Sequence, residues 1–224
     1  MASARAAAHH KHEAPSLIYN LGALAMGAAM AGLGLAYGID ALGRNARPSA
    51  DPVHSEQLVG RTLAGRQLAI PASWLASGTA YANGFAKQID LIVTIPVADG
   101  GATEVAVTLL PRSQARPSSS LLDGVYLHQF MPEQVNGPPG LIGKPLMAAD
   151  GYAGETVWYD PISPKPFVAK CIAPVAGAED SRCLRTVYVG TGIAAVYDFE
   201  IGALDTWRQF DAEMEARLKR IGAL

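Results

Sequence analysis

Residues 88–110 read QIDLIVTIPVADGGATEVAVTLL, and this stretch decides the fold of the larger part of the chain. Apolar side chains occupy every second position from Ile89 to Val97, and the same alternation resumes over 105–109. A period of two is the pattern of a strand that buries one face, and Asp99-Gly100-Gly101 carries the residue types of a tight turn. The stretch therefore predicts an antiparallel β-hairpin with one buried face.

Further strands are predicted on both sides of this hairpin. A short one over 67–70 ends at Pro71, which has no N–H group to donate to a neighbouring strand. The remaining predicted strands form two hairpins with turns that contain glycine or proline, over residues 155–160, 166–172, 182–189 and 193–201. Together these segments predict about six to seven strands, paired mainly as antiparallel hairpins.

One helix is predicted between the hairpins. Ser119 or Ser120 can cap its first turn, and apolar residues recur along one side as far as position 131. The residues that follow, 132–154, are rich in glycine and proline. They predict a long irregular loop.

A second helix is predicted at the C-terminal end, from about 203 to 221. Its apolar side chains recur at spacings of three and four residues, and Gly222 follows as a termination signal. The expected fold class is α+β: a mainly antiparallel β domain with one mid-domain helix and this C-terminal packing helix.

Residues 17–39 form a run without a charged side chain, LIYNLGALAMGAAMAGLGLAYGI. As a helix this run would span about 34 Å, enough to cross a hydrocarbon core of about 30 Å. We expect a single transmembrane helix, and the alternative interpretations are a cleaved signal peptide or a buried globular helix. The expected segments are a tail (1–15), an anchor (16–40), a linker (41–57) and an α+β domain (58–224).

Small residues lie along one side of the predicted transmembrane helix. Gly27, Ala31, Gly34 and Gly38 share a face, and the last two form a GxxxG pair. This spacing lets two helix backbones approach closely in lipid. The face is therefore a candidate for contact with a second helix, and the alternative is the alanine and glycine bias of a GC-rich bacterial gene.

The two cysteines, Cys171 and Cys183, flank a loop between two predicted strands. If those strands pair, the side chains face each other, and a disulfide closing such a loop stabilises the fold by about 2–3 kcal/mol. A disulfide requires an oxidising compartment. The alternatives are two reduced thiols or a redox-active pair, and the absence of a CxxC motif counts against the latter.

The cysteines also decide the expected topology, because basic residues are balanced on the two sides of the apolar run. Arg5 and Lys11 precede the run, whereas Arg44 and Arg47 follow it. We expect a protein of the bacterial inner membrane, with a cytoplasmic N-terminus and a periplasmic main domain.

The composition excludes two classes of protein. The chain has 224 residues, of which 50% are hydrophobic and 17% charged, and its net charge is -2. Disordered proteins combine low hydrophobicity with high net charge, and nucleic-acid-binding domains usually carry a basic surface. We therefore expect a folded protein without a nucleic-acid partner.

The search for chemical motifs assigns no catalytic, cofactor-binding or metal-binding residue. The sequence contains no nucleophile elbow, HExxH, Walker loop or dinucleotide-binding glycine motif. His128 stands alone in the first predicted helix. We interpret it as a structural residue.

These observations predict a membrane-anchored accessory or binding protein whose exported domain acts with another envelope or inner-membrane protein, or with a second copy of itself. One alternative is a supernumerary subunit of a larger inner-membrane complex, docked through its small-residue transmembrane helix. A second is a hydrolase-like envelope enzyme, whose site would be sought around loop 132–154, beside His128 and Asp150.

Overall fold

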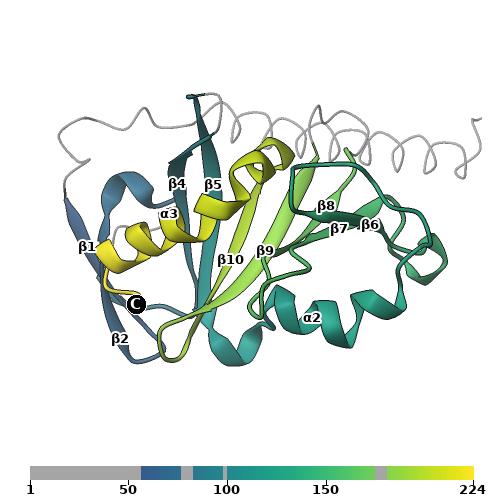
Figure 1. The fold of residues 1–224 in the computed structure, drawn as a ribbon. Helices are drawn as coiled ribbons and strands as arrows, with labels where there is room; N and C mark the ends of the chain where they lie inside the picture. Colours follow the sequence, from purple (N-terminus) through teal and green to yellow (C-terminus); the bar gives the residue numbers. More distant parts are fainter. Residues whose placement is uncertain (1–56, 77–82, 98–99, 175–180) are drawn as a thin grey trace, which may run out of the picture. The chain divides into compact units, whose positions relative to one another are not determined.

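The computed structural model describes residues 57–76, 83–97, 100–174 and 181–224 (Figure 1). The expected tail (1–15), the anchor (16–40) and all of the linker except Gln57 lie outside the described residues. So does the candidate helix contact at Gly27, Ala31, Gly34 and Gly38. Within the described ranges, none of the helices is both long enough and apolar enough to cross a membrane.

A seven-stranded antiparallel sheet forms the centre of the domain (Figure 1). In order across the sheet its strands are β4 (Ile89–Pro96), β5 (Ala102–Pro111), β10 (Ile193–Glu200), β9 (Arg182–Val189), β8 (Val168–Ile172), β7 (Glu155–Tyr159) and β6 (Ile142–Pro145). Two helices pack against it, α2 (Ser118–Gly124) and α3 (Trp207–Arg220). The expected α+β class with a mainly antiparallel sheet is confirmed for this domain.

The first hairpin has the geometry that its alternation predicts. β4 pairs with β5 in antiparallel register, with Leu91 opposite Val107. Leu91, Val93 and Ile95 are buried, whereas Ile92 and Thr94 are exposed. Burial of every second side chain therefore determines which face of this hairpin joins the core.

A second, three-stranded sheet lies outside the sequence prediction. β1 (Leu58–Leu63) pairs antiparallel with β2 (Arg66–Pro71) and parallel with β3 (Gly84–Phe85). The strand over 67–70 is confirmed as part of β2. The sequence did not predict β1, because its side chains do not alternate between buried and exposed: only Val59 and Leu63 are buried along it.

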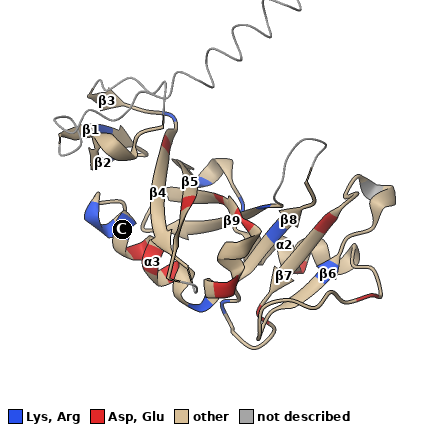
Figure 2. Cartoon of the chain, turned by 90° about the horizontal axis from the view of Figure 1, so that it is seen from above, with Lys and Arg blue, Asp and Glu red and all other residues tan. Residues whose placement is uncertain are grey.

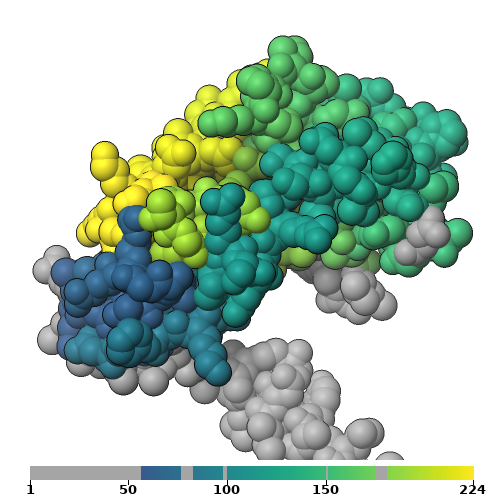
Figure 3. Space-filling model, turned by 90° about the horizontal axis from the view of Figure 1, so that it is seen from below, coloured from purple at the N-terminus to yellow at the C-terminus, as the bar shows by residue number. Residues whose placement is uncertain are grey.

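The C-terminal residues lie along β2, so the two ends of the described domain meet (Figure 3). The Ala69 N–H donates to the Ile221 carbonyl at 3.1 Å. The Arg66 guanidinium donates to the main-chain oxygen of Leu224 at 2.6 Å and to the Thr191 hydroxyl at 3.2 Å. These bonds link the small sheet to the end of α3.

α3 covers the main core. Phe210 is 1% exposed, and its ring lies 4.7 Å from Phe199 and 5.7 Å from Tyr197 in β10 (centroid to centroid). The sequence predicts a helix from about position 203, but α3 begins at Trp207. A 3₁₀ helix, η5 (Ile201–Thr206), first turns the chain back from β10. Gly222, at φ +82°, ends α3 as expected.

α2 covers a second, smaller core on the opposite side of the sheet. Leu122 and Tyr126 are buried there with Val157 of β7 and Val168 of β8. The predicted helix over 119–131 is wrong in its extent, because the chain leaves the helix at Val125 (φ -134°) and continues as a 3₁₀ turn, η3 (Tyr126–His128).

The expected helix cap is also wrong. No side chain caps α2, and the Ser118 hydroxyl instead accepts a hydrogen bond from the Thr186 N–H of β9 at 2.8 Å. This serine therefore ties the start of α2 to the sheet.

Loop 132–154 is less irregular than its composition suggests. It contains β6, which pairs with β7 and places Gly143 opposite Trp158. A Cβ atom on Gly143 would lie 2.6 Å from the Trp158 ring. The glycines that suggested a loop thus leave room for an aromatic ring, and they conceal a strand.

Candidate functional site

A groove of about 590 Å³ lies beside the edge strand β4. Its wall on one side is the 3₁₀ helix η1 (Ala72–Trp74), and its wall on the other is the last part of α3. The side chains that define it are Trp74, Ile92, Thr94, Glu104, Arg217 and Arg220. This volume falls within the range of about 300–1,000 Å³ that is usual for ligand sites.

Two local features place these residues around the groove. The alternation of β4 turns Ile92 and Thr94 away from the core. Pro71 ends β2, and the chain then runs beside β4, where Leu75 bridges Leu91 and the Ala76 N–H donates to the Asp90 carbonyl at 3.1 Å. This path brings Trp74 to the groove.

The end of α3 supplies the basic wall. The Gly222 N–H donates to the Lys219 carbonyl and the Ala223 N–H to the Leu218 carbonyl, which closes the helix in a Schellman motif. The last turn of the helix carries Arg217, Lys219 and Arg220. Figure 2 shows these basic residues at the end of α3, next to the label of the C-terminus.

The two groove arginines have different environments. Arg217 donates from Nε to the Thr94 carbonyl at 2.9 Å and from Nη1 to a Glu213 carboxylate oxygen at 2.6 Å. Arg220 is exposed and lies over the Trp74 ring at 5.7 Å. Within the described part of the chain, Arg220 has no hydrogen bond or ion pair, so its guanidinium remains available to a ligand.

The outer edge of β4 is closed to a further strand. The carbonyls of Asp90 and Thr94 already accept bonds from Ala76 and Arg217, and Pro96 has no N–H to offer. Bonds of this kind and edge prolines prevent sheets from pairing with other chains. The groove must therefore recognise a ligand through side chains.

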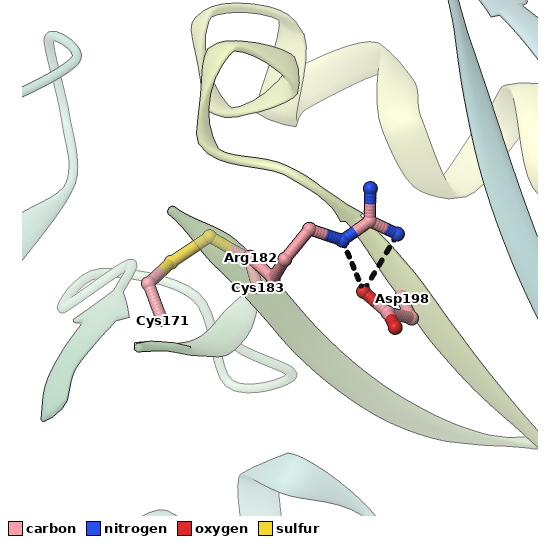
Figure 4. The surroundings of a disulfide bond; sticks show 4 residues. All are labelled: Cys171, Arg182, Cys183 and Asp198. Carbon is pink, nitrogen blue, oxygen red and sulfur yellow. Dashed lines mark hydrogen bonds and ion pairs between the residues drawn. A yellow bond between two sulfur atoms is a disulfide. The ribbon is translucent and has the colours of Figure 1, made fainter. Parts of the chain in front are cut away.

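The sheet face beside the groove carries both acidic and basic residues. The register places Thr94 of β4 opposite Glu104 of β5, and Glu200 of β10 opposite Arg182 of β9. Glu104 and Glu200 are exposed. Arg182 pairs with Asp198 at 2.8 Å (Figure 4), and both side chains are more than 40% exposed, so this bridge contributes at most about 1 kcal/mol.

The predicted disulfide between Cys171 and Cys183 is present in the structure (Figure 4). The two residues are directly opposite in β8 and β9, with their Cα atoms 3.9 Å apart. Cys171 is 3% exposed and Cys183 is fully buried. β8 and β9 share only three registered pairs, so the disulfide reinforces the shortest junction between neighbouring strands of the sheet.

An ion pair between buried Arg185 and half-exposed Asp211 joins β9 to α3 next to this junction. Arg185 is 5% exposed and donates to both carboxylate oxygens of Asp211, at 2.9 and 2.6 Å. It also donates to the Val168 carbonyl of β8 at 3.0 Å. With these bonds Arg185 holds β8, β9 and α3 together, which is a structural role.

The two residues beside which an enzyme site was sought around loop 132–154 lie in separate 3₁₀ turns. His128 is exposed in η3, where its backbone N–H donates to the Val125 carbonyl, and none of the described side-chain hydrogen bonds or ion pairs involves its imidazole. Asp150 lies in a separate 3₁₀ turn, Ala148–Asp150. In the described ranges, no three His, Cys, Asp or Glu side chains are grouped as a metal site would require.

Glu155, the residue that follows this loop, belongs to a partly buried ion pair. Lys170 and Glu155 form an ion pair at 2.7 Å, with side chains 21% and 13% exposed. Burial, together with the charges of Glu155 and Tyr152, raises the pKa of Tyr126 to about 12. Tyr126 therefore stays protonated near neutral pH and is unsuited to act as a base there.

Nothing in the sequence pattern identified the groove. Its key side chains, Trp74 and Arg220, come from opposite ends of the domain and meet only because the C-terminal segment packs along β2. From the sequence alone, Arg220 is one of several basic residues near a helix C-terminus, where they interact favourably with the helix dipole. Comparisons of this chain with protein-family models, curated proteins and solved structures found no match.

Proposed function

We propose that this protein is a membrane-anchored accessory protein whose exported α+β domain binds another envelope or inner-membrane protein. The observation that carries the proposal is the groove beside β4, where Arg220 is exposed and makes no hydrogen bond or ion pair within the described residues. Basic and aromatic side chains around an open groove are typical of binding surfaces.

The membrane anchor is supported by the sequence. Residues 17–39 contain no charged side chain and are long enough to span a bilayer as a helix. The exported location is supported by the disulfide between Cys171 and Cys183, since disulfides persist in oxidising compartments. Thiol labelling of cells that have been acid-quenched and denatured tests this location, because both cysteines are buried in the folded chain: reaction of either cysteine without prior reduction would contradict it.

Native extraction tests the proposed partner. The full chain is extracted from its membrane in a mild detergent, separated on a native gel and analysed by mass spectrometry. We expect a second protein to co-migrate at a fixed stoichiometry. Migration as a monomer, at protein concentrations that preserve known membrane complexes in the same extract, would contradict the proposal.

The second candidate function is a subunit docked through its transmembrane helix, and the small-residue face favours it. Replacing Gly34 and Gly38 with leucine would separate the two backbones and weaken assembly. Leucine at Ala29 and Ala36, on the opposite side of an ideal helix, is the matched control. Equal assembly of both double variants would exclude this role for the helix.

A further inference from the structure

We propose that the groove beside β4 binds an acidic segment of the partner protein, with a carboxylate of that segment on Arg220. This inference rests on the proposed function and adds the chemistry of the partner. It commits to a peptide segment in which acidic and apolar side chains alternate or adjoin.

The charge of the basic wall supports an acidic ligand. Arg217 and Arg220 both line the groove, and Lys219 is exposed in the same helical turn. Glu213 forms an ion pair with Arg217. Among the described residues, Arg220 has no such carboxylate partner and contacts only the Trp74 ring, by a cation–π interaction. A guanidinium offers paired N–H donors that match the geometry of a carboxylate.

The remaining surfaces define the rest of the ligand. Ile92 is 38% exposed at the floor, and Trp74 is only partly buried, so both present apolar area to a side chain. Glu104 also lines the groove and lies opposite Thr94. As a carboxylate it accepts hydrogen bonds, so it suits the N–H groups of a peptide rather than a second acidic side chain.

The closed edge of β4 excludes one common mode of peptide binding. Strand addition requires a row of free backbone groups. At β4, Arg217 occupies the Thr94 carbonyl and Pro96 lacks an N–H. A peptide segment in the groove is therefore bound by the side chains that line the groove. The affinity for the segment depends on Arg220 more than on backbone pairing with β4.

The test uses the full chain in detergent micelles and two synthetic octapeptides of leucine and glycine that carry either two glutamates or two glutamines. The chain contains three tryptophans, labelled with 5-fluorotryptophan and observed by ¹⁹F NMR. Trp74 lines the groove, whereas Trp158 is 5% exposed and Trp207 donates from its indole to the Pro139 carbonyl. A Trp74→Phe variant assigns the Trp74 resonance.

We expect the glutamate peptide to shift the Trp74 resonance saturably and Arg220→Gln to weaken that binding at least tenfold. The matched control is Arg208→Gln, because Arg208 is also exposed on α3 and lies over a tryptophan, 4.5 Å from the Trp207 ring, outside the groove. It should change the affinity by less than twofold.

Two results would overturn the inference: equal binding of the glutamine peptide, or an affinity unchanged by Arg220→Gln. If the glutamate peptide does not bind but native extraction shows a stoichiometric partner, the proposed acidic segment is wrong and the proposed function stands. Absence of any partner in that extraction would instead remove the proposed function.

Discussion

Loss of the disulfide between Cys171 and Cys183 is expected to lower the free energy of unfolding by about 3 kcal/mol. The bridge joins residues separated by 12 positions in the sequence. In the chain-entropy model, a loop of this length restricts the unfolded chain by roughly 9–10 cal/mol/K, which is about 3 kcal/mol at 25 °C. The destabilisation should be largest at the junction of β8 and β9, because these strands share only three registered pairs.

Urea unfolding of the full chain in detergent, followed by far-ultraviolet circular dichroism, measures this change. With a denaturant slope of about 2 kcal/mol/M, reduction of the disulfide should move the midpoint down by about 1.5 M. Hydrogen exchange of the β8 and β9 amides should accelerate more than that of β4 and β5, because β8 and β9 are the strands that the disulfide joins.

Two samples separate the bridge from the side chains that form it. The reduced wild-type chain keeps both sulfur atoms in the core, whereas a Cys171→Ala, Cys183→Ala double variant also loses their packing. The double variant should therefore be at least as destabilised as the reduced chain. If the reduced chain unfolds within about 0.5 kcal/mol of the oxidised chain, the entropic argument is wrong.

Three further predictions concern the two cores. Phe210→Ala should cost about 3–5 kcal/mol in urea unfolding, because its buried ring contacts Phe199 and the space would remain empty; a loss below about 1 kcal/mol would contradict that packing. Gly143→Ala should cost about 1–3 kcal/mol, since its Cβ would lie 2.6 Å from the Trp158 ring, and wild-type stability would refute the close approach. Burial raises the pKa of Tyr126 to about 12, above the value near 10 of an unfolded tyrosine, so stability should fall as pH rises from 10 to 12. Urea unfolding at each pH should show a smaller fall in stability for Tyr126→Phe than for the wild type. If the two proteins lose stability equally between pH 10 and 12, Tyr126 is not the cause of the fall.

The sequence predicted elements that are governed by local burial. The alternation from Ile89 to Val97 identified β4, and the three- and four-residue spacing identified α3, because a helix or strand buries one face with its own period. The cysteines were paired correctly because they flank a loop between two predicted strands, and those strands pair in the structure.

Predictions failed where a distant contact decided the local structure. Glycine favoured a loop over 132–154, yet Gly143 belongs to β6 because the Trp158 ring of β7 occupies the space above it. Ser119 or Ser120 was expected to cap the helix, but no side chain caps α2, and the Ser118 hydroxyl at its start accepts a hydrogen bond from Thr186 in β9. Neither partner is visible from the neighbouring residues alone.

The α+β class follows from the sequence, which also predicts a transmembrane run and an exported domain, because hydropathy and periodicity are properties of contiguous residues. Only the tertiary structure decided that Trp74 and Arg220 face the same groove. Their approach depends on the end of α3 packing along β2, through the bond from Ala69 to Ile221 and the contacts of Arg66. A binding surface built by two remote segments has no period of its own, so it becomes visible only when the chain has folded.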